Sequence, residues 1–254
     1  MRAVTNEIVR ILQITDTHLH AHREARMRGL NTYETFKAIV DRVENGTRKP
    51  DAVLATGDLV QDETRQGYHR FRKVVEKLNV PVHCLPGNHD FPEIMADVLD
   101  HEPFQFCGQA SYGKWRLIML NTVVRWDDGG RLDNNQLTFL DETLAACGNQ
   151  FALVAMHHHP VPMGSMWLDG IGLRNADEFF AIIDRYPQVR GITWGHVHQA
   201  ADSTRNGVRL MSAPSTCSQF LPNTDVFKLD LRPPGYRWLN LLPDGRIDTE
   251  VLWL

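Results

Sequence analysis

The stretch Ile11–His18 reads ILQITDTH, an apolar run that ends in an aspartate and a histidine. Its first part, Ile11–Thr15, has the β-branched and apolar character of a buried strand. Six further runs of this kind recur, and we predict that each is a strand: Ala52–Thr56, Val82–Leu85, Leu117–Asn121, Phe151–Met156, Gly191–Trp194 and Val208–Ser212. The spacing of these runs, and the polar residues that follow them, decide the predicted fold.

Longer amphipathic segments separate the strands. We predict helices at Thr32–Asn45, Thr64–Leu78, Pro92–Leu99, Asn134–Ala146 and Asn175–Tyr186. In Thr64–Leu78 the apolar residues follow the i, i+3, i+4, i+7 spacing of one helical face. Either Asp133 or Asn134 is placed to cap the fourth helix. Strands that alternate with helices indicate βαβ units and a largely parallel core, so the predicted fold class is α/β.

The chain from Gly207 onward has a different pattern. Turn residues separate the short runs Tyr236–Leu242 and Ile247–Leu254, and we predict that this part of the chain forms antiparallel strands. No internal repeat or linker interrupts the sequence, so residues 1–254 are predicted to form one domain.

The composition argues against several classes of function. The net charge is -4 and the pI about 6.3, without a clustered basic run, so no nucleic-acid partner is expected. No apolar stretch approaches the ~18 residues of a membrane span, and Met1–Arg10 lacks the apolar region of a signal peptide. The four cysteines form no CxxC pair. We therefore expect a cytoplasmic protein without a membrane partner; the sequence does not define its oligomeric state.

Five polar clusters share one position, because each follows a predicted strand. They are Asp16-Thr17-His18, Gly57-Asp58, Gly87-Asn88-His89-Asp90, His157-His158-His159 and Gly195-His196-Val197-His198. In an extended backbone residues i and i+2 point the same way, so Asp16 and His18 are expected to reach one ion; His196 and His198 have the same spacing. Ligands bind beyond the carboxyl ends of strands in open α/β sheets, so the clusters are expected to converge on one crevice. Their glycines are expected to let the backbone approach an ion.

The side chains in these clusters are of types that hold metal ions. Seven candidate ligands are present: Asp16, His18, Asp58, Asn88, His157, His196 and His198. Seven are too many for one catalytic ion, which must keep an open position, but they serve two ions if one carboxylate bridges. Carboxylate, imidazole and amide oxygen without thiolate suit manganese, iron, zinc or similar divalent ions. The remaining histidines lack this context and are expected to be solvated or structural: His20, His22, His69, His83 and His101.

Taken together, the five clusters resemble the pattern of the calcineurin-like metallophosphoesterase superfamily, which is D-x-H, G-D, G-N-H-[DE], a further His and G-H-x-H. More narrowly, the chain is similar to the bacterial class III 3′,5′-cyclic AMP phosphodiesterases. The segments that carry this narrower similarity are Leu12–Leu19, Ala55–Leu59, Leu85–Phe91, His157–Pro160, Trp167–Asp169, Leu173–Ala176 and Pro214–Cys217. The resemblance implies a four-layer α/β fold, α+β in some schemes, with two stacked β-sheets flanked by helices.

The resemblance also implies roles for individual residues. The first ion would be held by Asp16, His18, Asp58 and His198. The second would be held by Asp58, Asn88, His157 and His196, so that Asp58 bridges. His89 would be a catalytic group facing the substrate, with the other catalytic residue, Asp90, nearby to orient it. The substrate would contact His18, Asp58, Asn88, His89 and His198. Family members typically contain iron, manganese or both, and zinc, cobalt or magnesium are further options for the two divalent ions.

The implied reaction is hydrolysis of a small cyclic nucleotide, 3′,5′-cyclic AMP, to 5′-AMP. In this hypothesis a hydroxide that bridges the two ions attacks phosphorus, and His89 either stabilises the developing charge or protonates the leaving oxygen. Two other functions stay open: a metallophosphoesterase for a monoester or non-cyclic diester, and a protein-binding scaffold without catalysis. Arg174, Asn175 and Ser215–Cys217 either shape a nucleotide pocket or are ordinary loop residues. Trp167 either packs or stacks on a base.

Overall fold

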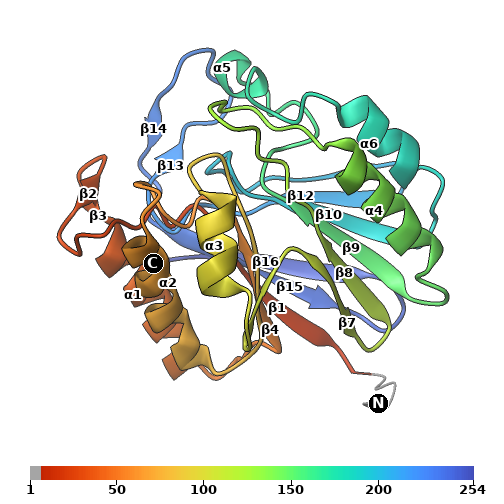
Figure 1. Cartoon of the computed structure of the whole chain (residues 1–254), viewed down its shortest axis with the longest axis horizontal. Helices are drawn as coiled ribbons and strands as arrows, with labels where there is room; N and C mark the ends of the chain where they lie inside the picture. The colour runs from red at the N-terminus through yellow and green to blue at the C-terminus, as the bar shows by residue number, and fades with distance from the viewer. Residues whose placement is uncertain (1–6) are drawn as a thin grey trace.

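Two six-stranded β-sheets form the centre of the protein (Figure 1). This computed structural model describes residues 7–254, so the prediction made for Met1–Arg10 lies mostly outside the described residues. The first sheet has the strand order β16-β15-β1-β4-β5-β6. Its strands are β16 (Ile247–Trp253), β15 (Gly235–Leu241), β1 (Val9–Ile14), β4 (Ala52–Thr56), β5 (Val82–Leu85) and β6 (Phe104–Phe106).

The second sheet lies face to face with the first and has the order β11-β12-β10-β9-β8-β7. Its strands are β11 (Asp202–Arg205), β12 (Val208–Ser212), β10 (Val189–Trp194), β9 (Phe151–Met156), β8 (Trp115–Met119) and β7 (Gly108–Tyr112). Two short hairpin-like pairs lie outside the large sheets. They are β2 (Arg26–Met27) with β3 (Leu30–Asn31), and β13 (Gln219–Phe220) with β14 (Leu229–Asp230).

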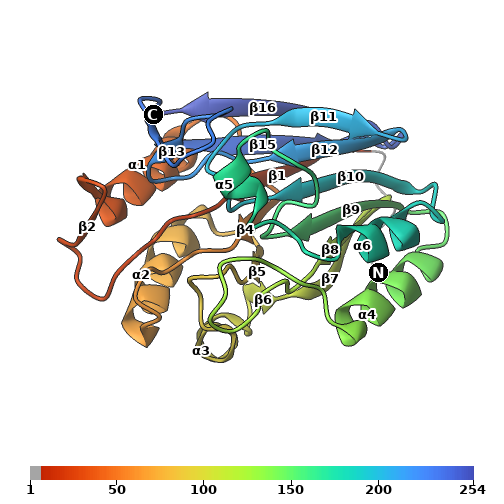
Figure 2. The same cartoon turned by 90° about the horizontal axis from the view of Figure 1, so that it is seen from above.

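Helices cover the outer face of each sheet. Figure 2 shows α1, α2 and α3 on the side of the first sheet, and α4 and α6 on the side of the second. Their bounds are α1 (Thr32–Asn45), α2 (Arg65–Val75) with the 3₁₀ turn η1 (Glu76–Leu78), α3 (Pro92–Leu99), α4 (Asn134–Ala145), the single turn α5 (Met166–Asp169) and α6 (Ala176–Ile183). The architecture therefore has the four layers that the resemblance implied. Within residues 7–254, no helix is both long and apolar enough to cross a membrane.

Strand periodicity explains why the protein has three apolar cores. Neighbouring residues in β1 point to opposite faces of the sheet, since side chains alternate along a strand. Leu12 packs in the core beneath α1, α2 and α3, whereas Ile11 packs in the core between the two sheets. A third core lies between the second sheet and the helices α4 and α6. Both sheets thus bury two faces, which accounts for strands that are apolar throughout rather than alternating.

The predicted elements agree closely with the structure. The bounds predicted for β4, β5, β9, β12, α1 and α3 are those observed. Asp133, rather than Asn134, caps α4 by accepting a hydrogen bond from the amide of Gln136 at 2.8 Å. The central strands pair in parallel, and the C-terminal hairpin β15–β16 is antiparallel. The antiparallel prediction holds for only one edge of β12, which follows Gly207: it pairs antiparallel with β11 but in parallel with β10.

Candidate metal centre

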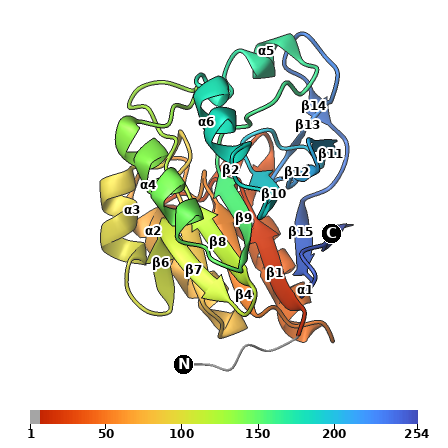
Figure 3. The same ribbon diagram turned by 90° about the vertical axis from the view of Figure 1, so that its right-hand side faces the viewer.

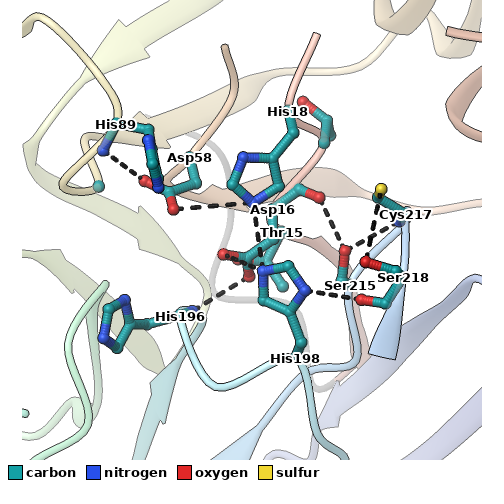
Figure 4. A network of polar contacts seen from close by, with 12 residues as sticks. Thr15, Asp16, His18, Asp58, His89, His196, His198, Ser215, Cys217 and Ser218 are labelled. Atoms are coloured by element: carbon teal, nitrogen blue, oxygen red, sulfur yellow. Dashed lines mark hydrogen bonds and ion pairs between the residues drawn. The ribbon is translucent and has the colours of Figure 1, made fainter. Parts of the chain in front are cut away.

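All seven predicted ligands lie just beyond the carboxyl ends of central strands. The first sheet supplies Asp16 and His18 after β1, Asp58 after β4 and Asn88 after β5; the second supplies His157 after β9, and His196 and His198 after β10. Six of the seven are buried, and Asn88 is half-buried. Figure 4 shows the side chains of Asp16, His18, Asp58 and His198 directed toward one another. The predicted convergence of the clusters is therefore found.

Asp16, His18 and His198 form the first group of ligand atoms. His198 donates its Nδ1 proton to the carbonyl of Ser218 at 2.6 Å, because a carbonyl can only accept. The Nε2 atom of His198 is then unprotonated in the neutral ring, and it lies 3.3 Å from Asp16 Oδ1 and 3.2 Å from His18 Nε2. A hydrogen bond from the distal ring nitrogen to a carbonyl is how proteins orient a metal-binding histidine.

His157 lies in the second group and is oriented in the same way. Its Nδ1 donates to the carbonyl of Thr56 at 2.7 Å, which leaves Nε2 facing inward. That atom lies 3.2 Å from Asn88 Oδ1 and 3.4 Å from Asp58 Oδ1. His196 belongs to this group as well, with its ring centroid 5.0 Å from that of His157.

Asp58 lies between the two groups. Its Oδ1 faces His157 Nε2 at 3.4 Å, and its Oδ2 faces His18 Nε2 at 3.8 Å. The amide of His89 donates to Oδ1 at 2.9 Å and so fixes the carboxylate (Figure 4). One oxygen toward each group is the arrangement that a bridging carboxylate requires.

The unpaired donor atoms fit divalent cations. Among the described residues, Asp16 Oδ1 and His196 Nε2 are buried without a hydrogen-bond partner, an expensive state in an ion-free protein. Two ring nitrogens 3.2 Å apart, as in His18 and His198, also need a proton or a cation between them. The seven side chains therefore fit a pair of divalent ions.

The charge states of the ion-free site also suit metal binding, because ligands must be deprotonated. Burial lowers the pKa of His18 to about 3, so this ring is neutral. Burial alone would raise the pKa of Asp58, but the rings of His157 and His89 outweigh it, and the pKa lies well below the ordinary value. His157 is the exception: Asp58 and Asp16 overcome the effect of burial and raise its pKa to about 9. An arriving ion must displace this proton.

The backbone at the site departs from the extended conformation that the i, i+2 argument assumed. Five of the seven candidates have positive φ, a region that side chains with a Cβ atom rarely adopt: Asp16 (53°), His18 (44°), Asp58 (51°), His196 (65°) and His198 (47°). Such residues cost about 1–3 kcal/mol each and gather at functional sites. The extended backbone assumed for these residues is thus wrong, but Asp16 and His18 do lie in one common group, as expected. His196 and His198 lie in different groups.

Two glycines in the clusters are required by close approach. A Cβ atom at Gly87 would lie 2.2 Å from Asp58 Oδ1, and one at Gly57 would lie 2.5 Å from His157 Nδ1. Gly57 also has a φ of +91°, which side chains disfavour. The glycines let neighbouring loops pack directly against the candidate ligands.

His158 and His159 differ from His157 in their surroundings. His158 lies close enough to His157 and His196 to join their group, but its Nδ1 contacts the Thr122 hydroxyl at 2.7 Å and its Nε2 contacts the Asp128 carbonyl at 3.2 Å. Both of its nitrogens are therefore engaged by the protein. His159 lies outside every group of potential ligand atoms among residues 7–254.

His89 and Asp90 have separate roles. The Gln61 amide donates to His89 Nδ1 at 3.1 Å, so the predicted orientation of His89 by Asp90 is wrong. Asp90 instead accepts hydrogen bonds from four donors: the amides of Leu59, Val60 and Gly87 and the Tyr68 hydroxyl. Burial and the nearby Asp58 raise the pKa of Asp90 to about 7. Asp90 thus ties together the loops that carry Asp58 and Asn88. Gln61 was missed, although it follows Asp58 by only three residues.

A cavity of about 210 Å³ opens beside the metal centre. Its lining includes candidate ligands, among them His18, Asp58 and Asn88, together with His89. The remaining lining residues are Met27, Arg28, Asp128, Trp167, Ile171, Phe220 and Phe227, of which only Trp167 was a candidate in the sequence. None of Arg174, Asn175 or Ser215–Cys217 lines this cavity: Arg174 pairs with Asp127, Asn175 bonds to Leu132, and Ser215 donates to the Asp16 carbonyl.

A sandwich of two sheets with two linked groups of metal-binding side chains at the strand ends defines a metal-dependent phosphoesterase. The model of the calcineurin-like phosphoesterase family matches residues 9–200, and the chain belongs to this family.

Curated relatives match nearly the whole chain. It is 39% identical over 255 residues to the 3′,5′-cyclic adenosine monophosphate phosphodiesterase CpdA of Pseudomonas aeruginosa, covering 97% of this chain and 90% of that protein. It is 38% identical over 244 residues to the CpdA of Escherichia coli K12, covering 96% and 89%. A 3′,5′-cyclic-nucleotide phosphodiesterase of Nostoc is 36% identical, covering 96% and 91%.

Solved structures share the fold at low sequence identity. A dimetal phosphatase from Danio rerio superposes with a TM-score of 0.69 at 13% identity, covering 96% of this chain and 98% of that one. A purple acid phosphatase from yellow lupin has a TM-score of 0.65 at 17% identity, covering 98% of this chain and 54% of that one. These similarities concern the fold alone.

Proposed function

We propose that this protein hydrolyses 3′,5′-cyclic AMP to 5′-AMP. The observation that carries the proposal is the 39% identity, over 97% of the chain, to a protein named as a 3′,5′-cyclic AMP phosphodiesterase. The two groups of ligand atoms, which Asp58 joins, can hold the two ions that this hydrolysis requires. Because the ligand-type residues are all present, a scaffold role without catalysis has less support.

We assign Asp16, His18, Asp58 and His198 to one ion, and Asp58, Asn88, His157 and His196 to the other. The grouping of ligand atoms supports this division, since His198 lies with Asp16 and His18 while His196 lies with His157. Iron and manganese are the proposed metals because mixed carboxylate and imidazole donors suit such ions; zinc, cobalt or magnesium are the other options. Metal analysis of the purified protein tests the identity.

When bound, divalent ions supply Lewis acidity, which activates water and offsets the charge on the phosphoryl group. The protein contributes the position of the substrate and the path of a proton. Asn88 and His89 line the cavity beside Asp58, where they can contact the phosphoryl oxygens. With Gln61 donating to His89 Nδ1, a neutral His89 carries its proton on Nε2. That Nε2–H is the group we propose to donate to the leaving 3′ oxygen.

We also propose that residues 1–254 form a single domain that acts in the cytoplasm on a small molecule rather than on nucleic acid or at a membrane. The C-terminal strand β15 pairs with β1 in the first sheet, which supports one folding unit. All four cysteines are unpaired, as is usual in a reducing compartment.

The decisive experiment compares substrates on protein purified and loaded with Mn²⁺. We expect cyclic AMP to be hydrolysed to 5′-AMP, and chromatography detects this product. Cyclic GMP, a 2′,3′-cyclic nucleotide and bis(p-nitrophenyl) phosphate are tested under the same conditions. Asp58→Asn serves as the inactive control. Hydrolysis of bis(p-nitrophenyl) phosphate alone would contradict the proposed activity and indicate a different phosphodiester as substrate.

A further inference from the structure

We propose that Arg28, Trp167, Phe220 and Phe227, here called the aromatic wall, bind the base of a nucleotide whose phosphate lies at the metal centre. This inference rests on the proposed function and adds the part of the substrate that the ligand residues do not explain. The 210 Å³ cavity is lined both by candidate ligands of the metal centre and by the aromatic wall. A nucleotide likewise combines a charged phosphate, which suits the metal centre, with an aromatic base, which suits the wall.

The rings of the wall pack against one another. Ring centroids of Trp167 and Phe220 are 5.4 Å apart, those of Trp167 and Phe227 are 5.3 Å apart, and those of Phe220 and Phe227 are 5.2 Å apart. All three pairs are close to edge-on, the arrangement that aromatic rings favour. Trp167 is half-buried and Phe227 is 40% exposed, so apolar ring surface is left uncovered.

The wall is joined directly to the metal centre through Phe220. Its ring lies parallel to that of His198, with an angle of 5° between the planes and 4.0 Å between centroids. His198 in turn faces Asp16 and His18. A ligand that places a phosphate at the metal centre therefore has aromatic surface within reach of its other end.

Arg28 gives the wall an unpaired cation. Its guanidinium lies 4.2 Å from the ring centroid of Phe227, and within residues 7–254 it forms neither a hydrogen bond nor an ion pair. Arg28 and Gly29 form the turn between β2 and β3, both with positive φ (51° and 85°). Asn-Gly is the usual choice for such a turn, so Arg28 carries backbone strain there. Its free donors are available to acceptors on the sugar or base, because the phosphate lies at the metal centre.

The elements of the wall come from distant parts of the sequence. Arg28 lies in the β2–β3 turn, Trp167 on α5, Phe220 on β13 and Phe227 between β13 and β14. Figure 3 shows α5, β13 and β14 together at the top of the molecule, above the sheets.

A second cluster, also made of an arginine and aromatic rings, lines another cavity that includes Asn88 and is the rival location for the base. There Arg125 lies 4.0 Å from the ring centroid of Phe91 and 5.1 Å from that of Trp126. The cavity at that cluster measures only about 20 Å³, and Trp126 is 86% exposed. The larger cavity and the mutual packing of three rings favour the aromatic wall, and Trp126 provides a matched control.

The first test measures steady-state kinetics with two substrates, cyclic AMP and the 3′,5′-cyclic phosphate of 1-O-methylribose, which lacks the base. For Trp167→Leu we expect KM for cyclic AMP to rise about tenfold, the usual loss when one aromatic ring under a base is removed, with KM for the base-free ester unchanged. Trp126→Leu should leave both constants unchanged. Equal effects of Trp167→Leu on both substrates, or a larger effect of Trp126→Leu, would overturn the inference. Failure of the wild-type protein to hydrolyse cyclic AMP would instead overturn the proposed function.

The second test measures binding without catalysis, by titration calorimetry of the Mn²⁺-loaded protein with 5′-AMP and with ribose 5-phosphate. We expect the wild-type protein to bind 5′-AMP about tenfold or more tightly than ribose 5-phosphate, and Arg28→Asn and Trp167→Leu to reduce this preference. Arg28→Asn also relieves a strained turn, so its melting temperature should be equal or higher. Weaker 5′-AMP binding in a more stable variant excludes misfolding as the cause. A preference for 5′-AMP that survives in both variants would refute the aromatic wall.

Discussion

The metal centre and the aromatic wall lie against the same cavity but are built in opposite ways. At the metal centre, six of the seven candidate ligands are buried, His157 and His198 are each oriented by a backbone carbonyl, and five residues hold strained backbone angles. The wall is partly exposed, comes from short elements and loops, and is held by ring contacts. Chemistry at phosphorus requires fixed atoms, whereas a flat base needs only a flat partner. Substitutions at the metal centre should therefore lower kcat, whereas substitutions in the aromatic wall should raise KM for substrates that carry a base.

The largest effect is expected for Asp58→Asn. The substitution removes charge from the carboxylate whose two oxygens face His157 and His18, one from each group of ligands. Loss of an outer partner of a metal ligand already costs about 10–100-fold, so we expect loss of metal and a fall in activity well beyond that range. Elemental analysis and cyclic AMP turnover measure the two effects. A variant that keeps two ions would contradict the bridging assignment.

His89→Ala should lower kcat by about 10²–10⁴-fold, the usual contribution of a proton donor, while both ions stay bound. The reason is that His89 lines the cavity and Gln61 engages its Nδ1, although its ring also lies edge-on to that of His18, with 5.2 Å between centroids. Elemental analysis beside kinetics checks both parts. Loss of metal in this variant would place His89 among the structural supports of the site and weaken its catalytic role.

Gln61→Met tests the orientation of His89 and should act more mildly. The side chain keeps its size but loses the amide that donates to His89 Nδ1. We expect kcat to fall about tenfold, at the low end of effects from an outer partner, with KM and metal content unchanged. A change in KM for the base-free ester would show that Gln61 acts on the position of the substrate. It would then contradict the separation of turnover at the metal centre from recognition at the aromatic wall.

The smallest effect on activity is expected for His83→Gln, a substitution outside both regions. Burial lowers the pKa of His83 to about 4, against about 6.5 in an unfolded chain. Between these values the unfolded chain binds a proton that the folded protein does not, so stability falls as pH decreases from about 6.5 to 4. The loss from this one group is on the order of 2–3 kcal/mol.

His83→Gln should therefore flatten the dependence of melting temperature on pH in this range without changing kcat or KM at neutral pH. Thermal unfolding between pH 4 and 7, with the wild-type protein in parallel, checks the prediction. An unchanged pH profile would show that other groups dominate acid sensitivity.

Sequence patterns predicted most of the fold because they are local. The apolar runs and the helical stripes depend on neighbouring residues, so the bounds of β4, β9 and α1 were predicted correctly. The seven ligand-type residues were also recognisable, since each follows a strand directly. The turns at Asp16 and His196 were not, because a left-handed backbone is imposed by tertiary packing and leaves no periodic trace.

The remaining features depend on contacts between distant segments. The tautomers of His157 and His198 are set by the carbonyls of Thr56 and Ser218, and carbonyl positions cannot be read from residue types. The aromatic wall combines a turn near residue 28 with a loop near residue 227, so no local pattern joins its members, and only Trp167 was a candidate to stack on a base. Gln61 and Arg28 had no motif to mark them.

His18 and His198 face each other across the metal centre, yet they are 180 residues apart in the chain. During synthesis, all the candidate ligands of the first sheet leave the ribosome before His196 and His198 have been added to the chain. Under the proposed assignment, a chain that ends before His196 lacks one of the four ligands of each ion, so we expect full metal loading only after this segment has been synthesised. We therefore expect the metal centre to be among the last parts of the fold to be completed, because its two halves come from distant parts of the sequence.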